Sequence, residues 1–221
     1  MKIIAITDIH GHLEAIDRIG TELKSVDLVL LAGDLTHFGQ EKEVKQVLER
    51  IMEYNRQILA VPGNCDQPQV ETYLNLYHLN LHGRGKTFNN LGIVGLGGSL
   101  PCPGHTPNEY SEQQLAEFLQ QGKAMLNAAH NPFILLSHQP PKNTLNDRVA
   151  LNFHVGSKVV RQFIEQFQPL ICFTGHIHEG IGIDTIGPTK IINPGPLRQG
   201  GYTYAEIGTS VTLLEIKALS G

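Results

Sequence analysis

The sequence has few cysteines, no block of like charge and no long apolar run, and each shortage argues against a class of protein. Its three cysteines, Cys65, Cys102 and Cys172, are an odd number and include no Cys-x-x-Cys pair. They argue against a disulfide framework and favour a reducing cytoplasm. The net charge of −4, without basic clusters, argues against a general nucleic-acid or anionic-membrane binder, although a local basic cleft stays open.

The apolar run at residues 1–6 is too short for a signal peptide or a membrane span, and it leads directly into Thr7-Asp8. We therefore expect no targeting or membrane segment. The length of 221 residues, with 41% hydrophobic and 17% charged residues, is typical of a soluble globular protein. Because no linker, repeat or low-complexity stretch divides the chain, we expect one domain over residues 1–221.

Residues 2–174 alternate short apolar runs, which predict buried strands, with stretches of helical periodicity. This repeated order of strand, polar loop and helix predicts an α/β fold with parallel strands. Asn89-Asn90 predicts a hairpin turn, and Ser111 with Gln114 three residues on predicts a capped helix start. The predicted strands are 2–7, 26–32, 58–61, 133–137 and 170–174 with a hairpin at 87–96, and the predicted helices are 13–24, 41–54, 68–76, 111–126 and 155–167.

After Gly180 the pattern changes to short strands separated by turns with glycine or proline, which predicts antiparallel pairing. These strands are 181–186, 189–192, 202–206 and 211–216. We therefore expect a parallel half and an antiparallel half that form two packed sheets. The Gly/Pro-rich stretch after Gly97 predicts a loop, and we expect its residues 99–110 to cap a cleft.

Each predicted core strand of the parallel half is followed by a potential metal ligand. Singly, each ligand has an ordinary explanation, since Asp and Asn are common in turns and a lone His-x-His pair is usually an exposed polar segment. Jointly they are hard to explain as accidents, because the carboxyl ends of parallel strands converge on one crevice, where sites form. The residues are Asp8 and His10 after the first strand, Asp34 after the second, Asn64 after the third, His138 after the fourth, and His176 and His178 after the fifth.

Seven nitrogen and oxygen ligands are too many for one tetrahedral zinc and suit two metal ions that share a bridging carboxylate. The mixture of imidazole, carboxylate and amide oxygen suits Mn, Fe, Zn, Ni or Co. Ions that prefer thiolate would need more cysteine than this chain has. The sequence therefore predicts two divalent metal ions, with manganese preferred.

The motifs Asp8-x-His10, Gly33-Asp34, Gly63-Asn64, His138 and Gly175-His176-x-His178, in this order, resemble those of the calcineurin-like metallophosphoesterase superfamily. The resemblance covers residues 8–178. The Gly-Asn-Cys-Asp variant at 63–66 is similar to a small prokaryotic phosphodiesterase-like branch rather than to the Ser/Thr protein phosphatases. The resemblance implies a metallo-dependent phosphatase-like fold, which is a four-layer α-β-β-α sandwich of two mixed sheets.

The resemblance also implies how the ligands are shared. One metal would be held by Asp8, His10 and His178, the second by Asn64, His138 and His176, with Asp34 bridging both. The implied activity is a phosphoesterase, and more specifically a phosphodiesterase, in which a metal-bridging hydroxide attacks phosphorus in line. Asp34, Asn64 and His138 would then be the catalytic residues.

This chain departs from the commoner family pattern at Cys65, where many members have histidine. A thiol with a pKa near ~8.5 can donate a proton, but a free cysteine is more often a small buried apolar residue. Loss of the histidine weakens protonation of the leaving group. The expected substrates therefore have acidic leaving groups, such as aryl esters or nucleotides.

Three further side chains are candidates for binding substrate: Cys65, His37 and His154. His37 corresponds to the place where an arginine contacts phosphate in the protein phosphatases, and its alternative is an exposed loop residue. His154 precedes the helix expected at 155, whose N–H groups and ring would line a phosphate pocket. Asp66 would orient a ligand histidine or cap a helix, and Asn193-Pro194-Gly195 resembles the family's closing turn beneath the site.

His12, after Gly11, is either a residue near a helix start or part of the site. His78, His82, His105 and His130 follow no predicted strand end, and we interpret them as surface residues. The expected partner is a small-molecule phosphate ester or phosphodiester, with nucleic acid left open, no membrane and no oligomeric state indicated. Two alternatives are a phosphomonoesterase acting on a small metabolite and a non-catalytic protein-binding scaffold of the same fold. A metallo-β-lactamase type is disfavoured because its His-x-His-x-Asp-His motif is absent.

Overall fold

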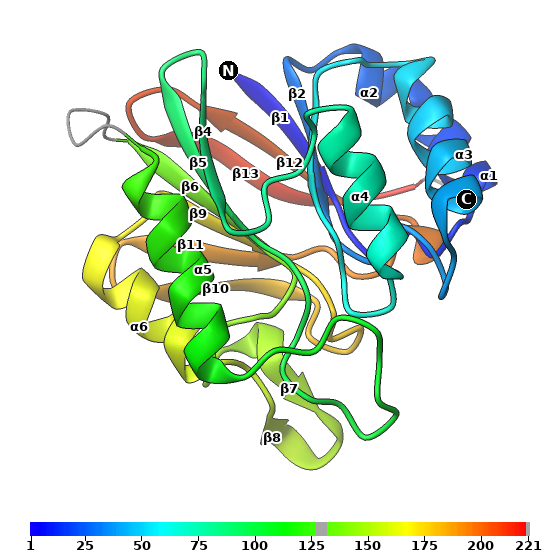
Figure 1. Cartoon of the computed structure of the whole chain (residues 1–221). Coiled ribbons are helices and arrows are strands. Elements are labelled where there is room, and N and C mark those ends of the chain that lie inside the picture. The colour runs from blue at the N-terminus through cyan, green and yellow to red at the C-terminus, as the bar shows by residue number, and fades with distance from the viewer. Residues whose placement is uncertain (127–131, 220–221) are drawn as a thin grey trace.

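Two β-sheets pack face to face, and helices cover both outer faces (Figure 1). The structure, a computed structural model, describes residues 1–126 and 132–219. The first sheet has the order β13-β12-β1-β2-β3. Its strands β1, β2 and β3 are parallel, and β12 is antiparallel to both of its neighbours, β1 and β13. Its strands are β1 (Lys2–Ile6), β2 (Leu28–Ala32), β3 (Ile58–Val61), β12 (Gly201–Ile207) and β13 (Val211–Ala218).

The second sheet has the order β10-β11-β9-β6-β5-β4. Its four central strands are parallel, and its two edge strands, β10 and β4, are antiparallel to their neighbours. The strands are β4 (Arg84–Phe88), β5 (Leu91–Leu96), β6 (Phe133–Ser137), β9 (Ile171–Thr174), β10 (Gly182–Ile186) and β11 (Thr189–Asn193).

Three apolar cores lie between the four layers, and the predicted α-β-β-α sandwich of two mixed sheets is confirmed. One core lies between the first sheet and α1–α4, one between the sheets, and one between the second sheet and α5 and α6. Ile3 and Ala5 of β1 point into the core between the sheets, whereas Ile4 and Ile6 pack under the helices. The helices are α1 (Leu13–Arg18), α2 (Gly20–Lys24), α3 (Glu41–Met52), α4 (Pro68–Leu76), α5 (Glu112–Ala124) and α6 (Lys158–Phe167).

The expected division into a parallel half and an antiparallel half is wrong, because each sheet contains both kinds of pairing. After β3 the chain crosses to the second sheet, so the later parallel strands β6 and β9 lie there. The β10–β11 hairpin extends the second sheet through β9, whereas the β12–β13 hairpin returns to β1 of the first. The sequence pattern could not assign the hairpins, because buried central strands of both sheets are apolar on both faces.

Two predicted helices differ locally from the structure. The helix expected over 13–24 is two helices that meet at Ile19, where Gly20 lies against the ring of Tyr54 without room for a Cβ atom. The helix expected from 155 begins at Lys158, because Ser157 caps it by accepting a hydrogen bond from the Val160 N–H. No helix within residues 1–126 and 132–219 combines the length and apolar character that a membrane crossing requires.

The predicted turn and cap are both confirmed. Asn89 and Asn90 have positive φ angles of 44° and 66° in the turn between β4 and β5, and Ser111 and Gln114 form the capping box of α5. Sequence patterns did not predict the short elements between β6 and α6 or the one after β11. These are η1 (Leu145–Asp147), β7 (Arg148–Val149), η2 (Ala150–Asn152), β8 (Phe153–His154) and η3 (Leu197–Gln199).

His82 is buried, so its interpretation as a surface residue is wrong. Its ring packs on Phe118 and Tyr110, with centroids 4.3 Å and 5.3 Å away, and its Nδ1 accepts a 2.8 Å hydrogen bond from the Gly97 N–H. Burial lowers the pKa of His82. His78 and His105 are exposed as expected, and His130 lies outside the described residues.

We expect His82→Gln to reduce the loss of stability in mild acid. The unfolded chain takes up a proton on His82 near pH ~6.5, whereas the folded protein does so only at lower pH. The stabilising contribution is therefore complete above this pH and is lost as the pH falls toward the folded pKa. Between about pH 7.5 and 5.5, the free energy of unfolding, measured with urea, should fall in both proteins. The fall should be smaller in H82Q, by up to ~1.4 kcal/mol. The exposed His105→Gln serves as control, and equal losses in wild type and H82Q would contradict the prediction.

Candidate metal centre

The carboxyl ends of five strands, β1, β2 and β3 of the first sheet and β6 and β9 of the second, meet at one end of the sandwich. The structure brings all seven predicted ligand side chains together there. The linking distances are 3.4 Å from His178 Nε2 to Asp8 Oδ1, 3.8 Å from His10 Nε2 to Asp34 Oδ2, 3.5 Å from His138 Nε2 to Asp34 Oδ1, 2.9 Å from His138 Nε2 to Asn64 Oδ1, and 5.1 Å between the rings of His138 and His176.

Backbone hydrogen bonds hold the loops after β1 and β2 against each other. The Asp8 N–H donates to the Gly33 carbonyl at 3.1 Å, and the His10 N–H donates to the Asp34 carbonyl at 2.9 Å. Asp8, His10, Asp34 and His176 all have positive φ angles, between 48° and 67°, a conformation that costs an ordinary residue roughly 1–2 kcal/mol. Such strain persists where the surroundings over-determine the backbone, which is typical of functional sites.

Glycines in the predicted motifs make room for donors from neighbouring strands. A Cβ atom on Gly63 would overlap the Asp34 carboxylate, and one on Gly175 would overlap the side chains of Thr7 and Asp8. The missing side chain of each glycine therefore makes room for residues that follow another strand, Asp34 in the case of Gly63 and Thr7 and Asp8 in the case of Gly175. This requirement is set by the tertiary packing.

Asp8, His10 and His178 form the first donor group, with ligand atoms that all lie within 4.8 Å of one another. Asp8 Oδ2 accepts hydrogen bonds from the Thr7 hydroxyl and the His176 N–H. Within the described part of the chain, the buried atoms Asp8 Oδ1 and His10 Nδ1 accept or donate no hydrogen bond. His178 Nε2 lies 3.4 Å from Asp8 Oδ1 as an ion-pair contact, and this contact raises the pKa of His178. A buried carboxylate oxygen without a hydrogen bond, beside two imidazoles, is what a bound cation would satisfy.

The second donor group is His138, Asn64 and Asp34, together with His176, whose ring lies 5.1 Å from that of His138. His138 Nδ1 lies 2.7 Å from the Ala32 carbonyl, which can only accept, so this nitrogen carries the proton. In the neutral imidazole the lone pair is then on Nε2, which faces the oxygen of Asn64 at 2.9 Å and that of Asp34 at 3.5 Å. Converging acceptors without a proton between them repel one another, and a cation removes this repulsion.

Burial determines the charge state of the site. It lowers the pKa of His10 to about 4 and that of His176 to about 3, so both imidazoles are neutral at pH ~7 with lone pairs free to bind a metal. Burial also raises the pKa of Asp34, and Asp8 adds to this effect, because two carboxylates share a dry space. The donor set, with crowded carboxylates and the neutral imidazoles of His10 and His176, thus fits divalent metal ions.

Asp66 has neither of the roles expected of it. Its buried carboxylate accepts hydrogen bonds from the backbone N–H groups of Leu35, Thr36 and Gly63 and from the Thr36 hydroxyl. It therefore orients no histidine, and Gln67 occupies the N-cap position of α4. Asp66 instead joins the loop after β2 to the loop after β3, which carry Asp34 and Asn64.

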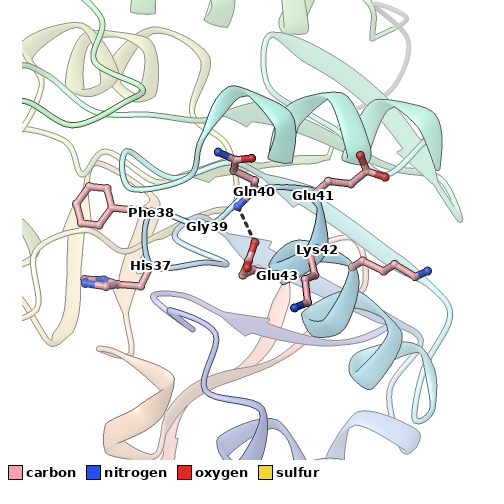
Figure 2. Close-up of a pocket in the computed structure, with 8 residues that line it drawn as sticks. His37, Phe38, Gly39, Gln40, Glu41, Lys42 and Glu43 are labelled. Carbon is pink, nitrogen blue, oxygen red and sulfur yellow. Dashed lines mark hydrogen bonds between the residues drawn. The ribbon is translucent and has the colours of Figure 1, made fainter.

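A cleft of about 590 Å³ opens over the donors. His37 and Cys65 line it, as expected of substrate-binding candidates, and so does His12, for which the sequence left a site role open. Cys102 reaches it from the 99–110 loop, which was expected to cap a cleft. Phe38 and Arg198 also line it, although no sequence pattern predicted them there. His37 and Phe38 also border an adjoining hollow at the start of α3 (Figure 2). A signal was available for Arg198, because it follows the predicted closing turn Asn193-Pro194-Gly195 by three residues.

His154 is not among the residues that line this cleft. Its Nδ1 lies 2.7 Å from the buried carboxylate of Asp147. The first N–H groups of α6, on Lys158 and Val159, donate to the Glu112 carboxylate. The phosphate pocket expected at this helix start is therefore already filled by a side chain of the protein.

Comparisons with known proteins agree with this geometry. Residues 1–180 match the sequence profile described as calcineurin-like phosphoesterase. The uncharacterized protein MJ1162 of Methanocaldococcus jannaschii is 42% identical over 203 residues, covering 89% of this chain and 88% of that protein. A dimetal phosphatase from Danio rerio has a similar fold, with a TM-score of 0.67 and 12% identity over 100% of this chain and 99% of that one. An archaeal phosphodiesterase aligns with a TM-score of 0.57 and 14% identity, over 99% and 100% of the two chains.

We expect Asp66→Ala to destabilise the protein by ~3 kcal/mol or more, because three buried N–H groups lose their acceptor at a cost of ~1–3 kcal/mol each. Urea unfolding of the metal-free protein measures this loss. The matched control is Asp27→Ala, which removes a single exposed bond to the Lys2 N–H and should cost ~1 kcal/mol or less. Similar losses in the two variants would contradict the anchoring role.

Proposed function

The chain belongs to the calcineurin-like phosphoesterase family, and from this premise we propose that it is a hydrolase that uses two divalent metal ions to cleave a phosphodiester. The observation that carries the proposal is the complete donor set at the strand ends, with its unpaired buried atoms. A non-catalytic scaffold would have no use for seven crowded donors, four of them on strained backbone, because they cost stability unless a cation occupies them.

The proposed ligands follow the two donor groups. Asp8, His10 and His178 would hold one ion, Asn64, His138 and His176 would hold the other, and Asp34 would contact both. When bound, such a pair of ions supplies an acidified water as nucleophile and neutralises charge on the phosphoryl oxygens. The mixed nitrogen and oxygen donors suit manganese, and the free thiols of the three cysteines suit a reducing cytoplasm.

The protein's own residues would bind and orient the ester. Arg198 and His37 line the mouth of the cleft, where they can donate hydrogen bonds to phosphoryl oxygens. Among the described residues of the cleft, Arg198 is the one side chain with a permanent positive charge. This supports a singly charged diester over a doubly charged monoester as substrate.

Cys65 would shape the choice of leaving group. Burial raises the pKa of its thiol, with the Asp34 carboxylate adding to the effect, so the sulfur stays protonated. A thiol of raised pKa is a poor proton donor to a departing alkoxide. Substrates whose leaving groups need little protonation, such as aryl or nucleotide esters, are therefore favoured.

We expect Asp34→Asn to lower kcat for hydrolysis of bis-p-nitrophenyl phosphate in the presence of Mn²⁺ by a factor of ~100 or more. The reason is the loss of the carboxylate charge that would contact both ions. Release of p-nitrophenol measures the rate, with p-nitrophenyl phosphate as the monoester comparison. The control Asp17→Asn changes an exposed carboxylate that contacts Arg50 and Tyr54, and it should leave the rate unchanged. Equal rates in D34N and wild type would refute the proposed function.

We further expect His176→Ala and His178→Ala to weaken different metal sites. Each removes one imidazole from one donor group and leaves the other group intact. Calorimetric titration of metal-free protein with Mn²⁺ should show two binding events in the wild type. Each variant should lose or weaken one of them by a factor of ~10 or more, and the double variant should lose both. If either single variant weakened both Mn²⁺ binding events equally, the assignment of His176 and His178 to different ions would be contradicted.

A further inference from the structure

Phe38 is an exposed aromatic residue in a conformation that is unfavourable for its type. Its side chain is 46% exposed, and its φ of 56° lies in the left-handed region, which favours glycine. A bulky residue in this conformation at the mouth of a cleft is neither buried for packing nor relaxed. Strain combined with exposure points to a role toward a ligand.

The loop that carries Phe38 is held in place at several points. The Phe38 N–H donates to the Cys65 carbonyl at 3.1 Å, and the Gly39 N–H donates to the Thr36 hydroxyl at 3.2 Å. Thr36 in turn is bonded to the buried Asp66. The aromatic ring is therefore presented from a braced backbone, which reduces the entropy cost of binding against it.

A row of rings leads from the metal centre to Phe38. The ring centroids of His10 and His37 are 5.4 Å apart, and those of His37 and Phe38 are 5.0 Å apart. Figure 2 shows His37 and Phe38 projecting to the same side of the loop, away from Lys42 on α3. Phe38 is thus two ring contacts from a proposed metal ligand, within reach of an aromatic group that is joined to the phosphate either directly or through a sugar.

We propose that Phe38 is the platform on which a planar aromatic group of the substrate stacks, either a nucleobase or an aryl ring, while the phosphate lies over the donor groups. This inference rests on the proposed function, since it places the substrate in the same cleft. An aromatic face accepts any base or aryl ring, so Phe38 selects aromatic esters over alkyl esters without distinguishing among bases. Arg198 in the same cleft supplies the charge that retains the phosphate.

The chain contains no tryptophan, so Phe38→Trp introduces a sole indole reporter at the platform. Adenosine 5′-monophosphate and phenyl phosphate represent the nucleobase and the aryl ring, and ribose 5-phosphate lacks both. Indole fluorescence of F38W, with and without Mn²⁺, should be quenched by one or both aromatic probes and not by ribose 5-phosphate. The matched control is Phe153→Trp, at a phenylalanine that is 65% exposed outside the cleft and should respond to none.

Inhibition of bis-p-nitrophenyl phosphate hydrolysis provides the second readout. In the wild type, adenosine 5′-monophosphate should inhibit roughly tenfold more tightly than ribose 5-phosphate, a ratio that corresponds to ~1.4 kcal/mol. The ratio should fall to about one in Phe38→Ala and persist in Phe38→Tyr, which retains the aromatic face.

The outcomes separate this inference from the proposed function. The platform is wrong, and the hydrolase stands, if the wild type hydrolyses the substrate with equal inhibition by adenosine 5′-monophosphate and ribose 5-phosphate, and all three probes quench F38W equally. A wild type without hydrolysis would overturn the proposed function, and the fluorescence of F38W would then decide the platform by itself. Quenching of F153W that matches F38W would also count against the platform.

Discussion

The site depends on the crowding of two buried carboxylates, Asp8 and Asp34, beside the neutral imidazoles of His10 and His176 at the meeting point of two sheets. Asp34 lies within reach of Asp8 and His138, and burial makes its ionised form costly. His10 and His176 do not offset this charge, because burial keeps them neutral. The arrangement is electrostatically incomplete by itself, and divalent cations are the simplest species that complete it.

The fold maintains this costly arrangement by bracing the loops from outside. The buried Asp66 carboxylate accepts hydrogen bonds from backbone N–H groups of two loops. Backbone hydrogen bonds between the loops after β1 and β2 fix the relative position of those loops. The positive φ angles of Asp8, His10 and Asp34 are a consequence of this bracing. The same bracing extends to the rim of the cleft, where it presents Phe38 toward the space above the donors.

Sequence patterns predicted most of the strands and helices and the convergence of the seven candidate donors, because each donor follows an apolar strand and convergence of parallel strand ends is a general rule. They did not predict Asp66 as an anchor, since its partners lie about thirty positions away in sequence. They also missed the burial of His82, which two aromatic rings from later segments enclose. Phe38 carried no periodic signal, because it lies in a loop whose course depends on distant contacts, and Arg198 lies in the short η3, which no pattern predicted.

The amino-acid sequence by itself determined where the core strands of the two sheets form, that several of their ends carry potential metal ligands, and that the chain resembles a phosphoesterase. These are local properties, set by apolar periodicity and by the residues that follow each strand. Only the tertiary structure decided how the strands divide between two sheets and which donors face each other. It also decided which other side chains reach the cleft. Those properties arise from contacts between residues far apart in the chain, which no local pattern encodes.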